Sequence, residues 1–339
     1  MSFMGVIGSK ASVAKELIAM MPPEAFGECY IELFLGGGGV FFAKKAARIN
    51  ILNDADPDLA VTFEAIQRNH KAVEKDLRVL LDDEETFRRV CQLRQSEEWH
   101  NEPAARRAAM VIFIHKASYN SNQVALASSS KSRSSFNSDL DLTEFAEKLK
   151  RAQIRCFDWR TCIDKYLYGP TPVEAFVLAD PPYVVADRAK HYRINFHAVE
   201  HVRFWHRMTR LTKDNGPGRN VKVMITYDDD PLIRALYREA DGWRTQPLLI
   251  NYAAAHDSGQ PRSELVITNY DVQEATGSNS SEDDSNADWS DVPHERVTLH
   301  DTPFDDLPCC KKEVFALLVQ GLRKGICRVC NRKVTRKEL

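Results

Sequence analysis

The chain has 339 residues, 43% of them hydrophobic and 28% charged, a balance typical of a globular protein that can bury a sizeable core. No apolar run reaches the roughly 18 residues that a membrane-spanning helix needs, and the N-terminus lacks the apolar stretch of a signal peptide. We therefore expect an intracellular protein without membrane contact. The net charge of −2 excludes no polyanionic partner, because residues 1–270 carry +1, residues 271–308 carry −10 and residues 309–339 carry +7.

The first predicted elements are a helix, a strand, a glycine turn, a second helix and a second strand. The glycine turn, Gly36–Gly39, follows a buried-strand pattern, and Asp54 closes the next strand. This order, with an acidic residue at the tip of the second strand, is typical of a nucleotide-binding βαβ unit. The helices are expected over residues 12–21 and 40–47, and the strands over residues 29–35 and 49–52.

Asp54 allows two interpretations. Its distance from Gly36 is close to the ~20 residues that separate the glycines from the acid of a nucleoside site, where the acid binds the ribose hydroxyls. The alternative is an N-cap, since a helix is expected to follow Pro57. The glycines alone are a weak indication of a ligand, because many strand-to-helix turns contain them.

Residues 57–151 are expected to form a helical, loop-rich insertion into the sheet. Residues 57–115 have a helical composition, with a break near residues 99–103. Residues 117–139 contain nine serines and three asparagines and too few apolar side chains for a core, so we predict a loop there. A short helix is expected over residues 144–151.

The remaining elements return to an α/β pattern, so residues 1–56 and 152–270 are predicted to form one domain. Residues 271–308 are acidic and poor in large apolar side chains, which predicts a disordered linker. Residues 309–339 are expected to form a small basic, Cys-rich module with a helix over residues 313–322. The other predicted strands cover residues 153–157, 174–179, 221–226, 248–252 and 263–270, and the other predicted helices cover residues 198–211 and 231–240.

The most specific motif is Asp180-Pro181-Pro182-Tyr183, which follows directly after a buried strand. The two prolines fix the backbone and remove two N–H donors, so the Asp180 carboxylate and the Pro181 carbonyl remain as acceptors beside the Tyr183 ring. This array suits a planar amine that needs two hydrogen-bond acceptors and a stacking partner. The alternative is a strand-ending turn with an exposed aromatic side chain, which does not require all four groups together.

Six segments in this order resemble the DNA adenine methyltransferases of the Dam type, and the likeness covers most of residues 5–270. Asp180–Tyr183 matches the catalytic DPPY motif of that family. The other five are Gly8-Ser9-Lys10 for the GSK element, residues 32–38 (ELFLGGG) for EPFxGGG, residues 53–59 (NDADPDL) for NDxNPDL, residues 156–158 (CFD) for the segment near the cofactor adenine, and residues 264–270 (ELVITNY) for ELLITNY.

The resemblance implies a Rossmann-like methyltransferase fold with a helical DNA-recognition insertion. It also implies transfer of a methyl group from S-adenosylmethionine to the exocyclic N6 amine of an adenine flipped out of double-stranded DNA at a specific sequence. Two alternatives remain open at this point: a catalytically silent DNA-binding or regulatory protein on the same fold, and an amino-methyltransferase that acts on RNA or cytosine. By the same analogy we expect a monomer or weak dimer in a bacterial or phage-infected cell.

Each functional role is carried over to the matching positions of this sequence. The catalytic group is Asp180, Pro181, Pro182 and Tyr183. The expected cofactor-binding residues are Gly8, Lys10, Glu32, Phe34, Gly36, Gly38, Asp54, Phe157, Asp158 and Asp180.

DNA-binding residues are expected in and before the serine-rich loop, because residues 101–160 hold ten Lys and Arg against six Asp and Glu. The alternative is a solvated helix face beside a loop without a ligand. The candidates are Arg106, Arg107, Lys116, Lys131 and Arg133 for phosphates, Asn120, Asn122 and Gln123 for base edges, and Tyr119 beside them.

The chain departs from the family pattern at three places. Val6 or Ile7 stands where relatives often carry an aromatic residue before GSK, which removes one stacking contact. Leu33 replaces the proline of EPF, a change that removes no functional group. After Tyr119 the chain reads NSNQVALASSS, whereas GATC-specific relatives carry NGLxRxN, so the arginine that would read a guanine edge is absent from that register. GATC specificity is therefore not expected. Protection of phage DNA, the methylase half of a restriction pair and a housekeeping role all remain open.

The cysteines fall into two groups. Four are scattered without ligand-like spacing, whereas the other four crowd into the last 31 residues, with one C-x₂-C pair. This spacing predicts a structural zinc ion in the C-terminal module, and the alternative is a packed helix beside free thiols. The expected ligands are Cys309, Cys310, Cys327 and Cys330.

Overall fold

The computed structural model divides into two compact units, Met1–Asp271 and Val272–Leu339, and each is described by itself. The sequence-based division into four parts remains a prediction. The structure describes residues 3–4, 8–118, 139–168, 173–184, 196, 198–213, 219–250, 262–272, 324–326 and 333–335.

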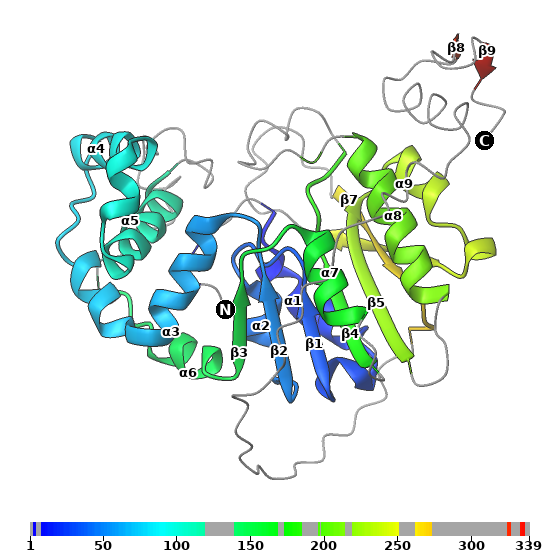
Figure 1. Cartoon of the computed structure of the whole chain (residues 1–339), viewed down its shortest axis with the longest axis horizontal. Helices are drawn as coiled ribbons and strands as arrows, with labels where there is room; N and C mark the ends of the chain where they lie inside the picture. The colour runs from blue at the N-terminus through cyan, green and yellow to red at the C-terminus, as the bar shows by residue number, and fades with distance from the viewer. Residues whose placement is uncertain are drawn as a thin grey trace. The chain divides into compact units, whose positions relative to one another are not determined.

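A seven-stranded sheet with the order β3-β2-β1-β4-β5-β7-β6 forms the centre of the first unit (Figure 1). Strands β1 to β5 pair in parallel, whereas β7 is antiparallel to both β5 and β6. The expected α/β fold is confirmed. The strands are β1 (Cys29–Glu32), β2 (Ile49–Asn53), β3 (Ala152–Arg155), β4 (Val173–Ala179), β5 (Arg219–Asp228), β6 (Arg244–Ile250) and β7 (Arg262–Thr268).

Helices cover both faces of the sheet, because parallel connections cross over in the right-handed sense. The connection through α2 (Gly39–Ala43) runs from β1 toward one edge. The connections through α7 (Trp159–Leu167) and α8 (Ala198–Lys213) run toward the other edge, which puts them on the opposite face. Figure 1 shows α7 and α8 together in front of the strands. Between these layers the central strand β4 is covered on both sides, with Ala175–Ala179 at most 2% exposed.

The strand order reverses between β1 and β4, and this reversal locates the site. In open α/β sheets ligands bind beyond the carboxyl ends of the strands at such a point. The glycine turn follows β1, and Asp180 follows β4. Two motifs that are far apart in the sequence are therefore brought to the same edge of the sheet.

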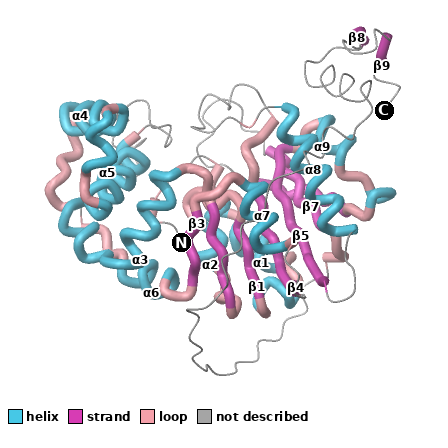
Figure 2. The backbone as a smooth tube through the Cα atoms, in the orientation of Figure 1, coloured by secondary structure: helices cyan, strands magenta, loops and turns pink. Residues whose placement is uncertain are grey.

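The insertion between β2 and β3 is helical, as expected, and it lies beside the β3 edge of the sheet (Figure 2). The predicted break near residues 99–103 is confirmed. A kink inside the first helix was not predicted: Asn69 is non-helical (φ −159°, ψ 72°), and its Oδ1 accepts the N–H of Ala72 at 3.1 Å. The elements are α3 (Pro57–Leu77), α4 (Glu84–Gln95), the 3₁₀ helix Glu97–Asn101, α5 (Ala104–Ala117) and α6 (Thr143–Leu149).

Several predicted boundaries were wrong, and one helix was missed. Helix α7 escaped prediction because it has nine residues, too few for its apolar repeat to stand out, although Trp159, Ile163 and Leu167 are all buried. Strand β6 begins and ends earlier than predicted. Helix α1 covers only Ala14–Ala19 after a 3₁₀ turn at Lys10–Ser12, helix α2 ends at Ala43, and α9 is Pro231–Leu236, followed by a 3₁₀ turn at Glu239–Asp241.

The second unit is described only as a two-stranded antiparallel hairpin. Strand β8 (Lys324–Ile326) pairs with β9 (Lys333–Thr335), with Gly325 opposite Val334. This hairpin was not predicted. The helix predicted over residues 313–322, the acidic linker and the four C-terminal cysteines lie outside the described residues.

Candidate active site

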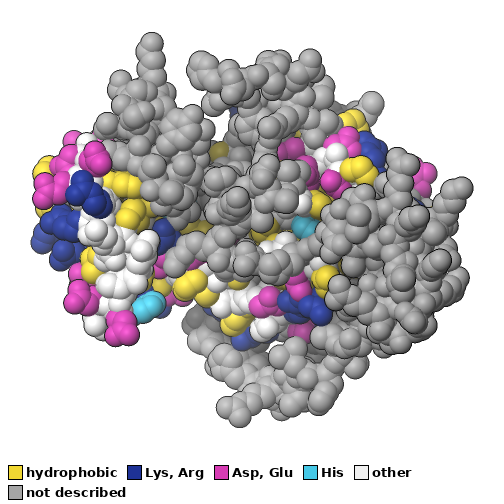
Figure 3. Space-filling view, turned by 90° about the horizontal axis from the view of Figure 1, so that it is seen from above, with side chains coloured by type: hydrophobic (Ala, Val, Ile, Leu, Met, Phe, Trp, Pro, Cys, Tyr) yellow, Lys and Arg dark blue, Asp and Glu magenta, His cyan; other side chains and the backbone are white. Residues whose placement is uncertain are grey.

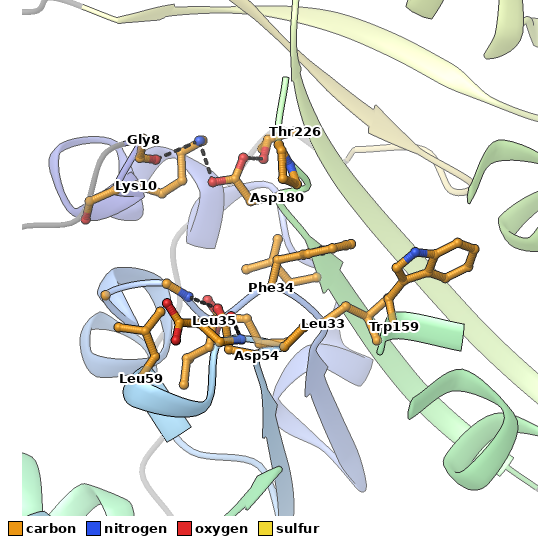
Figure 4. A pocket seen from close by; sticks show the side chains of 18 of the residues that line it. Gly8, Lys10, Leu33, Phe34, Leu35, Asp54, Leu59, Trp159, Asp180 and Thr226 are labelled. Atoms are coloured by element: carbon orange, nitrogen blue, oxygen red, sulfur yellow. Dashed lines mark hydrogen bonds and ion pairs between the residues drawn. The ribbon is translucent and has the colours of Figure 1, made fainter. Parts of the chain in front are cut away.

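A cavity of about 180 Å³ opens at the carboxyl ends of the central strands (Figure 4). Of the ten residues predicted to bind the cofactor, nine line it, and Pro182 of the predicted catalytic group lines it as well. Gly38 does not. The nine are Gly8, Lys10, Glu32, Phe34, Gly36, Asp54, Phe157, Asp158 and Asp180.

Two positions in the loop after β1 require glycine for backbone conformation and close packing. Gly38 is the N-cap of α2 in the left-handed region (φ +66°), where a Cβ atom would also lie 2.9 Å from the Phe42 ring. A Cβ atom on Gly39 would lie 2.8 Å from the backbone nitrogen of Ala11. Gly39 therefore lets the 3₁₀ turn at Lys10–Ser12 approach the loop closely, which brings Lys10 to the cavity.

Asp54 is not the helix cap that the alternative interpretation required, because Asp56 caps α3 by accepting the N–H of Asp58 at 2.9 Å. Asp54 Oδ2 accepts the N–H of Gly36 at 2.8 Å, and Oδ1 accepts the N–H of Asp56 at 2.9 Å. Burial raises the pKa of Asp54 to about 6, although these hydrogen bonds lower it. The carboxylate joins the loops after β1 and β2 and keeps acceptor sites for a ligand hydroxyl.

Asp180 is held by two neighbours from distant parts of the chain. Its Oδ2 accepts a hydrogen bond from Lys10 Nζ and its Oδ1 one from Thr226 Oγ1, each at 2.6 Å. Lys10 Nζ also donates to the Gly8 carbonyl at 3.0 Å and lies 3.6 Å from Glu264 Oε2. Burial raises the pKa of Asp180, while the positive charge of Lys10 lowers it. The result is a carboxylate fixed in orientation at the cavity wall (Figure 4).

Tyr183 lies behind this carboxylate and is only 6% exposed. Its ring centre is 6.2 Å from that of Tyr227 and 5.0 Å from the Lys10 ammonium. Pro181 is also buried, and neither Pro181 nor Tyr183 lines the cavity. A base that stacks on Tyr183 therefore has to displace some of the atoms that cover the ring.

Comparisons with known proteins decide the family. A family model for D12 class N6 adenine-specific DNA methyltransferases matches residues 7–246. The chain belongs to this family. A DNA adenine methylase from Serratia marcescens is 26% identical over 257 residues, which cover 70% of this chain and 87% of that protein. A solved structure described as a conserved hypothetical protein from Streptococcus pyogenes covers 75% of this chain and 93% of its own, but its 12% identity and TM-score of 0.32 support no inference.

As a D12 class methyltransferase, the protein is an enzyme that methylates adenine at N6 in DNA, and its family uses S-adenosylmethionine. The resemblance found in the sequence is thereby confirmed. The seven-stranded sheet is consistent with a methyltransferase fold.

Several residues that line the cavity of this methyltransferase were not singled out from the sequence. Two of them, Thr226 and Trp159, could have been predicted from the sequence, because Thr226 is the last residue of a predicted strand and Trp159 follows Asp158. The others lie in helices or loops and carry no local signal. The residues missed include Leu17, His115, Trp159, Phe196, Glu200 and Thr226.

Aromatic side chains form one wall of the cavity. Phe34 makes edge-on contacts with Phe196 and Phe204, with ring centres 5.8 Å and 5.7 Å apart. Trp159 contacts Phe204 in the same way at 5.1 Å. Nearby, Glu200 of α8 forms an ion pair with Arg160 of α7. This wall is rigid and apolar, which suits the flat face of a heterocycle.

The predicted cofactor residue Glu32 is buried and accepts a hydrogen bond from the Tyr30 hydroxyl at 2.8 Å. Burial raises its pKa to about 8, while the Tyr30 hydrogen bond and the charge of Lys44 lower it. The folded protein therefore holds the proton of the Glu32 carboxyl group more tightly than the unfolded chain does. The stability that the protonated carboxyl group contributes is complete below its ordinary pKa of 4.5 and is lost as the pH rises toward 8.

We expect Glu32→Gln to remove this pH dependence. Between about pH 5 and pH 8 the wild-type protein should lose on the order of 3 kcal/mol of unfolding free energy that the variant retains, since one pKa unit is worth about 1.4 kcal/mol. Urea unfolding of both proteins at the two pH values measures the difference. Parallel losses in the two proteins would contradict the expectation.

Only part of the predicted DNA-binding set can be placed. Arg106, Arg107 and Lys116 lie on α5. Arg106 pairs with Glu102 at 3.3 Å, and burial lowers the pKa of Lys116. Figure 3 shows the molecule from above. At the end formed by α4 and α5, the Lys and Arg side chains are interspersed with Asp and Glu side chains. The predicted residues outside the described part are Tyr119, Asn120, Asn122, Gln123, Lys131 and Arg133.

Among the described residues, no cluster of three or more His, Cys, Asp or Glu side chains is placed to hold a metal ion. In the same part of the chain, no helix combines the length and apolar character needed to cross a membrane. The scattered cysteines Cys29, Cys91, Cys156 and Cys162 are free thiols, and burial raises the pKa of each. They are therefore weak nucleophiles.

Proposed function

We propose that this methyltransferase transfers the methyl group of S-adenosylmethionine to an adenine that has been flipped out of double-stranded DNA at a specific sequence. The observation that carries the proposal is the Asp180 carboxylate, held at the cavity wall by Lys10 and Thr226 with Pro182 beside it. The carboxyl ends of β1, β2 and β4 converge on one cavity, so an acid, a glycine loop and an acceptor array lie together.

The residues around the cavity fit S-adenosylmethionine. Phe34 and Phe157 offer apolar faces for its adenine, and Asp54 and Asp158 offer carboxylates for hydroxyl and amino groups. The chemistry of this donor set matches a ligand that carries a heterocycle, a ribose and a cationic amino acid. When bound, S-adenosylmethionine supplies an electrophilic methyl group.

The residues of the chain then act on the adenine amine, whose lone pair is delocalised into the ring. Each oxygen of Asp180 has two lone-pair sites and gives one to Lys10 or Thr226, so a further site stays open for the amine. Hydrogen bonds from the amine to Asp180 and to the Pro181 carbonyl aim the lone pair at the methyl group, with Tyr183 as the stacking partner. Orientation of this kind can supply about 7–11 kcal/mol of a barrier, so a strong base is not required. As the bond from the methyl carbon to nitrogen forms, its bond to sulfur would break to leave a neutral thioether, and the amine proton would pass by way of the Asp180 carboxylate to solvent.

The DNA contacts extend the proposal to the insertion. Arg106, Arg107 and Lys116 contact phosphates from α5, together with Lys131 and Arg133, while Asn120, Asn122 and Gln123 contact base edges beside Tyr119. Flipping the base costs a few kcal/mol, which these contacts have to offset. The enzyme acts as a monomer or weak dimer in the cytoplasm of a bacterial or phage-infected cell, at a site other than GATC.

Incubation of the purified protein with S-adenosylmethionine and unmethylated plasmid DNA tests the function. Mass spectrometry of the digested nucleosides should show N6-methyladenine, and sequencing that reports modified positions should place it in one sequence context. N4-methylcytosine, or methylation of RNA alone, would overturn the assignment of the base or the nucleic acid. Cofactor-independent DNA binding without any methylation would favour the silent DNA binder.

We also propose that Cys309, Cys310, Cys327 and Cys330 hold a structural zinc ion. The C-x₂-C pair lies in the sequence between β8 and β9, which pair as an antiparallel hairpin, and the module carries a charge of +7 that suits a non-specific grip on DNA.

Elemental analysis of the purified chain should find about one zinc per molecule. Removal with a chelator should unfold the C-terminal unit and leave cofactor binding unchanged. A full-length protein that contains no metal after purification with zinc present would dispose of the site.

A further inference from the structure

The side chain of Asn53, the last residue of β2, bonds to chain segments on both sides of its strand. Its Nδ2 donates to the carbonyl of Leu33, just beyond β1, and to the carbonyl of Phe157, beyond β3. Its Oδ1 accepts the N–H of Phe157, and all three distances are 3.0 Å. The residue is 0% exposed.

An amide is the side chain that this position requires. The ladder between β1 and β2 ends at the pair Glu32 and Leu52, and that between β2 and β3 ends at Asn53 and Arg155. Beyond these pairs the main chains still exchange the hydrogen bonds from Leu35 N–H to the Asn53 carbonyl at 2.9 Å and from Asp54 N–H to the Arg155 carbonyl at 3.1 Å. An amide offers two N–H donors and a carbonyl acceptor, the same kinds of group as a peptide unit, so it continues the ladder by one step on both sides. An apolar residue would leave three backbone groups without these partners: the buried carbonyl of Leu33 and the partly buried carbonyl and N–H of Phe157.

The two segments that Asn53 joins both belong to the cavity lining. Leu33–Gly37 lines it from the β1 side, and Phe157–Trp159 lines it from the β3 side, whereas Asn53 itself does not line it. We propose that Asn53 is a positioning residue that fixes the separation of these two segments and thereby sets the affinity for S-adenosylmethionine. This inference rests on the proposed function, since it takes the cavity to be the cofactor site.

Asn50 provides a matched control in the same strand. It is 1% exposed and makes the same set of bonds, accepting the N–H of Ala47 at 3.0 Å and donating to the carbonyls of Ala47 and Arg151 at 2.8 Å and 3.0 Å. It lies at the amino end of β2 and does not line the cavity. Loss of either amide removes three comparable hydrogen bonds, but only Asn53 joins parts of the cavity lining.

The test compares Asn53→Ala with Asn50→Ala in the full-length enzyme. Urea unfolding should show similar destabilisation. Calorimetric titration should show the dissociation constant of S-adenosylmethionine raised about tenfold in Asn53→Ala and within about twofold of wild type in Asn50→Ala. In methylation assays KM for the cofactor should rise in parallel in Asn53→Ala, while kcat at saturating cofactor stays within about twofold.

The outcomes separate this inference from the proposed function. A wild-type protein that does not bind S-adenosylmethionine contradicts the proposed function. A wild-type protein that binds it, with the two alanine variants equal in affinity, overturns the role of Asn53 alone. If Asn53→Ala does not fold, Asn53→Asp replaces it beside Asn50→Asp, because the carboxylate keeps the acceptor and loses both donors. If neither Asn53 variant folds, the residue belongs to the fold as such and the proposal is overturned.

Discussion

Replacement of Asp180 by alanine is expected to lower methyl transfer at least ~10²-fold, the scale seen when one preorganised polar contact to a reacting group is lost. The carboxylate is the acceptor that orients the adenine amine, and both of its oxygens are already fixed by Lys10 and Thr226 at 2.6 Å. Alanine removes the acceptor but leaves Lys10 its ion pair with Glu264 at 3.6 Å, so we expect the variant to fold.

Two measurements separate turnover from binding in this variant. Transfer of labelled methyl groups to DNA at saturating cofactor gives the turnover. Calorimetric titration should give a dissociation constant for S-adenosylmethionine close to that of wild type, because the other eight predicted cofactor-binding residues of the lining are unchanged. Asp229→Ala is the control, because Asp229 lies just after β5, pairs with Arg234 and does not line the cavity. Its turnover should match wild type. Undiminished turnover in Asp180→Ala would show that the amine is oriented by other groups.

The local pattern of the sequence was sufficient to place the glycine turn and the DPPY motif at strand ends. Strand, turn and helix alternate there with the periodicity that a buried parallel sheet imposes, and the carboxyl ends of such strands share one edge. That Asp54 and Asp180 line the same cavity follows from this rule once β1 lies next to both β2 and β4. The order of the strands itself was not readable from local pattern.

The partners of each functional group were beyond prediction for the same reason. Lys10 precedes Asp180 by 170 residues and Thr226 follows it by 46, and only the completed sheet brings the three together. Asn53 was noticed only as part of a motif, although its two partners, Leu33 and Phe157, directly follow the strands on either side of it. Local periodicity reports which residues are buried, whereas the identity of a partner depends on topology.

Asp58 shows how topology turns a motif residue into a structural joint between the first helix of the insertion and the elements that follow it. It lies in the first turn of α3 and is buried, with its carboxylate accepting hydrogen bonds from Arg94 Nε at 2.7 Å and from Trp99 Nε1 at 2.8 Å. Arg94 belongs to α4, and Trp99 to the 3₁₀ helix that follows. The sequence indicated only that Asp58 belongs to the segment that resembles NDxNPDL, whereas in the structure its carboxylate binds side chains of α4 and the 3₁₀ helix.

Arg94→Ala is therefore expected to destabilise the protein by about 3–5 kcal/mol, the cost of leaving a buried charge without its partner. The side chains of Arg94 and Asp58 are only 9% and 4% exposed, so water cannot replace the lost contact. Arg88→Ala on the same helix is the matched control. Its pair with Glu84 is 3.8 Å long between side chains that are 61% and 79% exposed, and such pairs contribute about 0.3–0.5 kcal/mol.

Urea unfolding of the two variants measures the contrast directly, because both replace arginine by alanine in one helix and so change helix propensity equally. A large loss in Arg94→Ala with little change in Arg88→Ala would show that α4 is held on α3 by the buried pair. Equal small losses would mean that the apolar packing of α4 carries the attachment instead. In that case the Asp58 carboxylate is satisfied by Trp99 and its remaining neighbours, and the joint between α3 and α4 is hydrophobic in origin.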